Sequence, residues 1–221
     1  MFRFVEAYVG EYASGKSENA INRAIEIKRI TNEKVTLVDL DTVEPFYTLR
    51  SLKKKLKEQY DIDVVTWETS ETMGLGEAGS IIKPEMRWVL RREGNIVLDI
   101  GYGVHGAKIL NLIEGANESE ELKIFAVINT CRPITGTVQD IVEYVQSLGR
   151  IDGIVNNTNL GDDTTKEVII EGEKIIEETS KILGIPIIYN AVNGEIINTL
   201  GSDDLKYPVK EIKRFMPDSM W

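Results

Sequence analysis

The sequence is poor in the residues that form disulfides and metal–sulfur sites. Its 221 residues include one cysteine, Cys131, and one histidine, His105. An intrachain disulfide is therefore impossible, and the ligands for a zinc site or an iron–sulfur cluster are too few. A lone cysteine suits a reducing compartment, so we expect a cytoplasmic protein.

The sequence also lacks an excess of positive charge and any long apolar run. Its 26 lysines and arginines stand against 36 acidic residues, which gives a net charge of −10. Such a chain lacks the cationic surface on which nucleic-acid binding depends, so we expect no nucleic-acid partner. No apolar run approaches the roughly 18–20 residues that span a bilayer, so we expect neither membrane attachment nor a cleaved leader.

Short apolar segments alternate with longer segments whose apolar residues recur at helical spacing. Alternation of this kind predicts a mostly parallel sheet covered by helices on both faces, a three-layer α/β fold. The length fits a single domain over residues 1–221. Strands are predicted at 2–9, 34–38, 62–66, 95–98, 124–128, 153–155 and 185–189, and helices at 16–30, 49–59, 84–92, 106–113, 137–148, 165–183 and 207–215.

One motif joins the first predicted strand to the first predicted helix. The run Gly10-Glu11-Tyr12-Ala13-Ser14-Gly15-Lys16-Ser17 matches the phosphate-loop pattern G-x-x-x-x-G-K-[ST]. Its glycines let the backbone wrap a phosphate, so that N–H groups and the positive end of the helix dipole face it. Lys16 is expected to reach the β- and γ-phosphates, and Ser17 to bind Mg²⁺. The sequence therefore predicts a nucleoside triphosphate site over residues 10–17, continued by Glu18 in the first helical turn.

Three aspartates stand at the ends of two predicted strands. Asp99 follows the strand 95–98 and precedes the run Ile100-Gly101-Tyr102-Gly103. Carboxyl ends of parallel strands meet at the ligand-binding edge, so Asp99 is a predicted Mg²⁺ ligand, and the glycines after it permit a loop that moves with the γ-phosphate. Asp39 and Asp41 end the second strand and project the same way. Asp41 is predicted to position the attacking water or the metal shell, with Asp39 supporting it.

Together these motifs resemble one branch of the P-loop NTPases, the SIMIBI class, which contains the MinD/ParA partitioning ATPases, nitrogenase iron protein, dethiobiotin synthetase and the cobyrinic-acid amidotransferases. The resemblance covers nearly the whole chain and is closest to bacterial nucleotide-binding proteins with a G-E-x-x-S-G-K-[ST] loop. It implies about seven mostly parallel strands, helices on both faces and one nucleotide site. It also implies that an asparagine at the end of a late strand contacts adenine, here Asn157 or, in reserve, Asn156.

Glu11 departs from the pattern of this branch. The partitioning ATPases and the iron protein carry a lysine at that position, which reaches the nucleotide of a partner subunit. A carboxylate cannot stabilise negative charge on a transferring phosphate. Either this mechanism is absent or another cation replaces the lysine, and the candidates are Arg132, at a strand end, and Arg50.

The resemblance implies ATP or ADP and Mg²⁺ as cofactors. It suggests a slow ATPase that acts as a nucleotide-driven switch, whose partner is a second copy of the chain or another protein. Two alternatives stay open: an ATP-dependent ligase or small-molecule kinase with an acceptor site at residues 67–80 and Arg132, or a scaffold that binds nucleotide without hydrolysis. ATP is favoured over GTP because the guanine motif N-K-x-D is absent, and Asn156–Asn159 stand in its place. The tail 206–221 is expected to dock on the domain.

Overall fold

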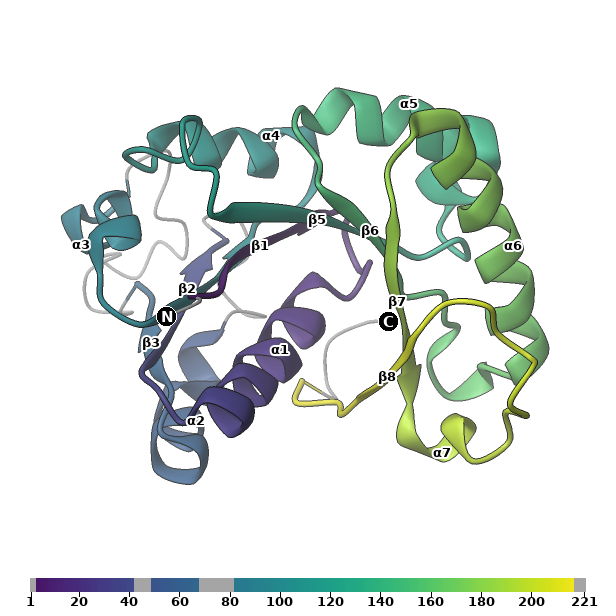
Figure 1. Ribbon diagram of the computed structural model, residues 1–221, viewed down its shortest axis with the longest axis horizontal. Coiled ribbons are helices and arrows are strands. Elements are labelled where there is room, and N and C mark those ends of the chain that lie inside the picture. The colour runs from purple at the N-terminus through teal and green to yellow at the C-terminus, as the bar shows by residue number, and fades with distance from the viewer. Residues whose placement is uncertain (1–2, 42–48, 68–81, 217–221) are drawn as a thin grey trace.

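A parallel sheet of eight strands forms the centre of the protein (Figure 1). The computed structural model describes residues 3–41, 49–67 and 82–216. Every pair of neighbouring strands is parallel, so all their carboxyl ends lie along one edge. The strands in sheet order are β3 (Asp63–Val65), β2 (Val35–Leu40), β4 (Asn95–Ile100), β1 (Val5–Gly10), β5 (Leu122–Ile128), β6 (Gly153–Asn156), β7 (Ile187–Asn193) and β8 (Val209–Ile212).

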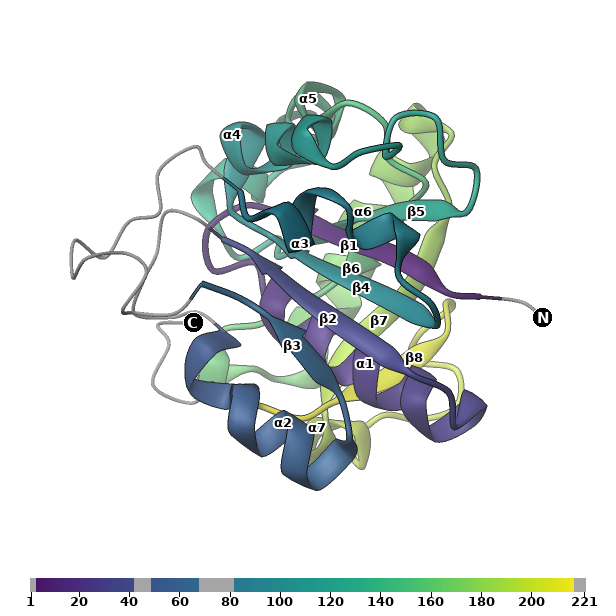
Figure 2. The same ribbon diagram turned by 90° about the vertical axis from the view of Figure 1, so that its left-hand side faces the viewer.

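Helices cover both faces of the sheet (Figures 1 and 2). One face packs against α1 (Lys16–Thr31) and α2 (Lys53–Tyr60), and the other against α3 (Pro84–Arg87), α4 (Gly103–Ala107), α5 (Val138–Leu148) and α6 (Lys166–Leu183). The remaining short helices are α7 (Gly194–Ile197) and five 3₁₀ turns: η1 (Leu49–Leu52), η2 (Val89–Arg91), η3 (Lys108–Leu112), η4 (Pro133–Thr135) and η5 (Gly161–Asp163). The predicted three-layer α/β class is confirmed.

Helix α1 begins where the phosphate loop ends. Gly15 adopts a left-handed conformation, with φ of 88°, which glycine reaches without steric cost. The residues that α1 turns toward the sheet recur at intervals of three or four and are fully buried: Ala20, Ile21, Ala24 and Ile27. The helix ends at Asn32, also left-handed. Packing of these apolar residues against the sheet therefore fixes the position of α1, whose first residue is Lys16.

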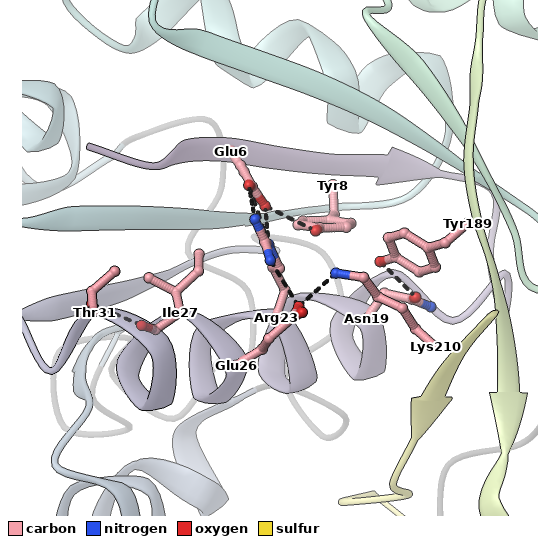
Figure 3. A network of polar contacts seen from close by, with 9 residues as sticks. All are labelled: Glu6, Tyr8, Asn19, Arg23, Glu26, Ile27, Thr31, Tyr189 and Lys210. Carbon is pink, nitrogen blue, oxygen red and sulfur yellow. Dashed lines mark hydrogen bonds and ion pairs between the residues drawn. The ribbon is translucent and has the colours of Figure 1, made fainter. Parts of the chain in front are cut away.

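A network of buried charges joins α1 to the sheet, although the first strand is otherwise apolar (Figure 3). Alternate residues of β1 face opposite layers, and Glu6 faces α1. Arg23 from α1 binds its carboxylate through two nitrogens, Nη2 at 2.7 Å and Nε at 2.9 Å. Arg23 also bonds Glu26 at 2.7 Å, and Lys210 of β8 bonds Glu26 at 2.6 Å. The network thus spans β1, α1 and the last strand.

The predicted terminal helix at 207–215 is wrong. Residues 209–212 form β8 instead, which pairs with β7 and raises the strand number from about seven to eight. Ile212 and Phe215 are both buried, so their spacing of three suggested a helical face. In the structure, Ile212 is buried as a residue of β8, and Phe215 is buried as a residue of the extended segment that follows β8. This segment contacts α1, which confirms that the part of the tail up to Met216 docks on the domain.

Three other predicted helices are broken into shorter pieces, and the first of them, residues 49–59, forms η1 and then α2. Residues 84–92 form α3 and then η2, and residues 106–113 lie mostly in η3. Pro84 occupies the first turn of α3, where its missing N–H costs nothing. Within the described part of the chain, no helix has both the length and the apolar character needed to cross a bilayer.

Candidate nucleotide-binding site

The loop between β1 and α1 closes tightly on itself. Lys16 folds back, and its Nζ donates to the Glu11 carbonyl at 2.9 Å. The Ser14 N–H donates to the same carbonyl at 3.2 Å. A side chain at Gly10 would lie 2.5 Å from the Val127 carbonyl, so only glycine fits there. The Ser14 hydroxyl is buried and has no hydrogen-bond partner among the described residues.

Two neighbouring segments hold the loop from outside. Asn157, directly after β6, donates its Nδ2 to the Ser14 carbonyl at 2.8 Å. Arg132, after β5, donates its Nε to the Ala13 carbonyl at 3.3 Å. In a trans peptide the C=O and the next N–H point in opposite directions, so fixing the Ser14 carbonyl outward turns the Gly15 N–H inward. An inward N–H beside Lys16 is an anion-binding arrangement.

Asp99 meets Ser17 at the carboxyl end of β4. Asp99 is 2% exposed and its carboxylate bonds the Ser17 side chain, yet its Oδ1 has no partner among the described residues. Burial and the nearby charge of Asp39 raise the pKa of Asp99 well above its usual value, while Ser17 and the charge of Lys16 act in the opposite direction. Mg²⁺ prefers oxygen ligands, so a buried carboxylate with an unpaired oxygen beside a hydroxyl fits this ion.

Asp39 lies beside Asp99, because the two are register partners in β2 and β4. Its Oδ1 accepts from the Asp41 N–H at 3.2 Å, and its Oδ2 from the Leu49 N–H at 3.2 Å and the Thr66 hydroxyl at 2.8 Å. Burial raises the pKa of Asp39 to about 6, against the Thr66 hydrogen bond, which lowers it. Asp39 therefore holds the backbone N–H groups of Asp41 and Leu49, on either side of residues 42–48.

Asp41 lies against the loop that follows Asp99. A side chain on Gly101 would lie 3.4 Å from the Asp41 Oδ1. Thr66 is the residue of this cluster that sequence patterns missed. The sequence feature that could have identified Thr66 is its position directly after β3, at the carboxyl end of a parallel strand. Most of the predicted acceptor segment, 68–80, lies outside the described residues.

Tyr12 contacts the loop after Asp99, and the Glu11 side chain lies near it. The Tyr12 ring packs edge-on against Tyr102, with 5.7 Å between ring centroids. A side chain on Gly103 would lie 3.7 Å from the Glu11 Oε2. Of the two candidate cations, Arg132 touches the phosphate loop, whereas the charge of Arg50 acts on Asp39.

A small, partly open pocket adjoins the start of α1. It is lined by Glu18, by Asn157–Asn159 after β6 and by Ala191–Asn193 in β7. Asn157 reaches it, whereas Asn156 uses both ends of its side chain inside the protein: its Nδ2 donates to Asn190 and its Oδ1 accepts from Thr158.

The single histidine and the single cysteine lie on different parts of the fold. His105 is exposed on α4, and Cys131 is a half-buried free thiol. Among the described residues, no three histidine, cysteine or acidic side chains are grouped so that they could hold a metal ion. A magnesium site at Ser17 and Asp99 would therefore take most of its ligands from phosphate and water, as is usual for this ion.

No family model matches the sequence, and no curated protein matches it significantly. Solved structures do match the fold. The cell division protein FtsY from Thermotoga maritima is 15% identical, with a TM-score of 0.55 over 98% of this chain and 66% of that one. FtsY from Elizabethkingia anophelis, in complex with GDP, is 15% identical, with a TM-score of 0.52 over 86% of this chain and 57% of that one.

A third match is the 54 kDa signal recognition particle protein from Aeropyrum pernix, also in complex with GDP. It is 17% identical, with a TM-score of 0.51 over 85% of this chain and 41% of that one. This chain spans at most about two thirds of these proteins. The chain shares the fold of these proteins, which belong to the SIMIBI class of P-loop NTPases. The resemblance inferred from the motifs is thus confirmed at the level of the fold.

Proposed function

We propose that this chain binds a nucleoside triphosphate with Mg²⁺ at residues 10–17 and acts as a nucleotide-driven switch with slow hydrolysis. The observation that carries the proposal is the Asp99 carboxylate, buried with an unpaired oxygen beside Ser17 and Lys16. A buried carboxylate without a full set of partners is costly. A Mg²⁺ ion held by Asp99 and Ser17 would supply the missing partner.

Each residue then has a role that follows from its position. Lys16 leaves the Glu11 carbonyl to neutralise the β- and γ-phosphate oxygens, and Ser17 and Asp99 hold the ion. When bound, Mg²⁺ withdraws charge from the phosphates. Asp41 faces the same space and orients the attacking water. Related proteins carry a second lysine in the phosphate loop. Arg132 replaces that lysine as the cation that supports the loop.

The switch element is the loop 100–103. Its Tyr102 packs against Tyr12, its Gly101 lies near Asp41, and its Gly103 lies near Glu11. A γ-phosphate entering between Lys16 and Asp99 changes the contacts of this loop and hence the position of α4, which begins at Gly103. Tyr12 is 39% exposed, so the change reaches the surface where a second copy or another protein would bind.

We propose ATP as the nucleotide, although two of the similar structures hold GDP. Guanine presents ring N–H and amino donors that an acidic side chain accepts. The one acidic residue among the pocket-lining residues is Glu18, whose carboxylate already accepts backbone N–H groups of the C-terminal segment. Calorimetry with Mg-ATP and Mg-GTP tests this: tighter binding of ATP is expected, and a preference for GTP would reverse the base assignment.

The Asp99→Asn variant should separate the stability that this buried carboxylate costs from the Mg²⁺ binding that it provides. We expect the gain in ATP affinity that Mg²⁺ produces to fall about tenfold or more, because a neutral amide holds the ion poorly. The nucleotide-free protein should instead become more stable at pH 7, by about 1–3 kcal/mol, because a buried charge beside Asp39 is removed. Calorimetry with and without Mg²⁺, and urea unfolding, measure the two effects.

The same variant should flatten the pH dependence of stability. The folded-state pKa of Asp39 is about 6, above the roughly 3.9 of an unfolded aspartate, and that of Asp99 is also raised. The folded state therefore binds more protons than the unfolded state between about pH 4 and pH 6, so stability falls as the pH rises through this window. With one of the two carboxyls gone, the fall should be smaller. A variant that loses stability and keeps its Mg²⁺ response contradicts the assignment.

A further inference from the structure

A series of buried hydrogen bonds runs from α6 through the sheet to the carboxyl ends of β6 and β5. Its members are Glu173 in α6, Asn190 in β7, Asn156 in β6 and Thr158 just after β6, and all four are between 0% and 7% exposed. The helix approaches this strand end closely, because a side chain at Gly172 would lie 2.4 Å from the Thr158 hydroxyl oxygen. Buried polar groups are costly unless they have partners, so the order of these bonds decides how the side chains face.

Every other member of the series donates toward Glu173. A carboxylate accepts hydrogen bonds and donates none, so Asn190 presents its Nδ2 to Glu173, at 2.7 Å. The Asn190 Oδ1 then faces Asn156, whose Nδ2 donates to it at 2.8 Å. The Asn156 Oδ1 is left to accept from the Thr158 hydroxyl at 2.6 Å and from the Thr158 N–H at 3.1 Å. The carboxylate, itself held by two backbone N–H groups of the segment before β8, thus determines the orientation of both amides.

The series ends at the two segments that hold the phosphate loop. Asn157 donates its Nδ2 to the Ser14 carbonyl, and the peptide bond after Asn157 is fixed because the Thr158 N–H is held. The Thr158 hydroxyl oxygen also accepts from the Thr130 N–H at 3.3 Å. Arg132, the other side chain that bonds the loop, follows two residues later. Both contacts of the loop therefore start from backbone that these buried hydrogen bonds hold in place.

We propose that Glu173 and Asn190 are positioning residues of the nucleotide site, which orient the Asn156 amide and so hold Asn157 against the phosphate loop. The inference rests on the nucleotide site proposed above. Neither positioning residue lines the pocket beside the loop, so both act through Asn156 and Asn157. The bond from Asn157 keeps a loop carbonyl outward, and the N–H that follows this carbonyl stays turned toward the phosphate.

Inorganic tripolyphosphate with Mg²⁺ is the probe, because it carries three linked phosphates and no base and therefore reports on the phosphate loop alone. Calorimetry compares the unchanged protein with Asn190→Leu, Thr158→Val, Thr158→Ser and the double variant Asn190→Leu/Thr158→Val. Valine keeps the shape of threonine and loses the hydroxyl, whereas serine keeps the hydroxyl and loses a methyl group. The control Ile176→Ala leaves a cavity among apolar side chains on the same helix as Glu173. Urea unfolding identifies the conditions in which each variant is folded.

We expect Asn190→Leu and Thr158→Val each to weaken Mg-tripolyphosphate binding about fivefold, the effect of one neutral hydrogen bond. The double variant should lose little more than either single variant, because both changes interrupt the same series of bonds. Thr158→Ser and Ile176→Ala should unfold at lower urea concentrations than the unchanged protein and still bind within twofold of it, because they remove packing and leave the hydrogen bonds in place.

Four results would overturn the inference. Unchanged binding in both Asn190→Leu and Thr158→Val would make the series a source of stability alone. Equal losses in Thr158→Val and Thr158→Ser would show that shape, and not the hydroxyl, matters. A loss of the same size in Ile176→Ala would attribute the effect to stability. Additive losses in the double variant would separate Asn190 from Thr158.

Two further cases are distinguished by the same measurements. If Asn190→Leu does not fold, Asn190→Ser takes its place, because a serine is too short to bond both Glu173 and Asn156, and the same fivefold loss is expected. If the unchanged protein binds neither Mg-ATP nor Mg-tripolyphosphate, the proposed nucleotide site itself is overturned, and this result is recognised before any variant is compared.

Discussion

Replacing Lys16 by alanine should weaken Mg-ATP binding at least 100-fold. A charge-assisted hydrogen bond contributes about 1.5–3 kcal/mol, and Lys16 is expected to make such bonds to two phosphates, while each 1.4 kcal/mol is a factor of ten in affinity. Lys16 is 7% exposed and already lies in the loop. Calorimetry measures the loss directly.

The control for Lys16→Ala is Lys174→Ala, which removes the same charge from an exposed pair on α6. It should leave ATP affinity unchanged within twofold. Binding of inorganic tripolyphosphate, which has phosphates and no base, should fall together with ATP binding in Lys16→Ala, because lysine contacts phosphates and not the base. If Lys16→Ala binds Mg-ATP as tightly as the unchanged chain, the nucleotide is not held at residues 10–17.

The parts of the site that sequence predicted are those encoded within a few residues. The phosphate loop is a contiguous run, and its strand and helix precede and follow it directly. Asp99 and Asp39 were found because each ends an apolar strand, and parallel strands bring such ends to one edge. The structure places them in register as neighbours, with Ser17 against Asp99.

The parts that sequence missed depend on contacts between distant residues. Thr66 acts on Asp39 from 27 positions away, and Glu18 holds N–H groups nearly 200 positions away. Neither of these long-range contacts produces a recognisable local pattern in the sequence. The end of the chain shows the consequence: Ile212 and Phe215 have helical spacing, but an open sheet edge at β7 and three polar side chains of α1 stabilise an extended conformation there.

Glu6 is a similar case, because a glutamate in an apolar strand predicts an exposed position and the structure buries it under α1. Its side chain is 7% exposed and that of its partner Arg23 is 14% exposed. A buried ion pair is a poor source of net stability, but removing one partner leaves the other charge in the interior. The pair joins the strand before the phosphate loop to the helix after it.

Arg23→Ala should therefore lower the free energy of unfolding by about 3–5 kcal/mol, because Glu6 stays buried without its cation. Urea unfolding measures the change, with Arg29→Ala as the control. Arg29 lies on the same helix, is exposed and makes no ion pair with the described residues, so its loss should cost under about 0.5 kcal/mol.

The double variant Glu6→Leu/Arg23→Met decides whether the loss in Arg23→Ala comes from the stranded carboxylate. Replacing both charges by apolar side chains of similar size removes the unpaired charge, so most of the lost stability should return. If the double variant is as unstable as Arg23→Ala, the loss comes instead from the contacts of Arg23 with Glu26 and the Phe4 ring. In that case the network stabilises the packing of α1 and β8, and it does not stabilise β1, the strand that leads into the phosphate loop.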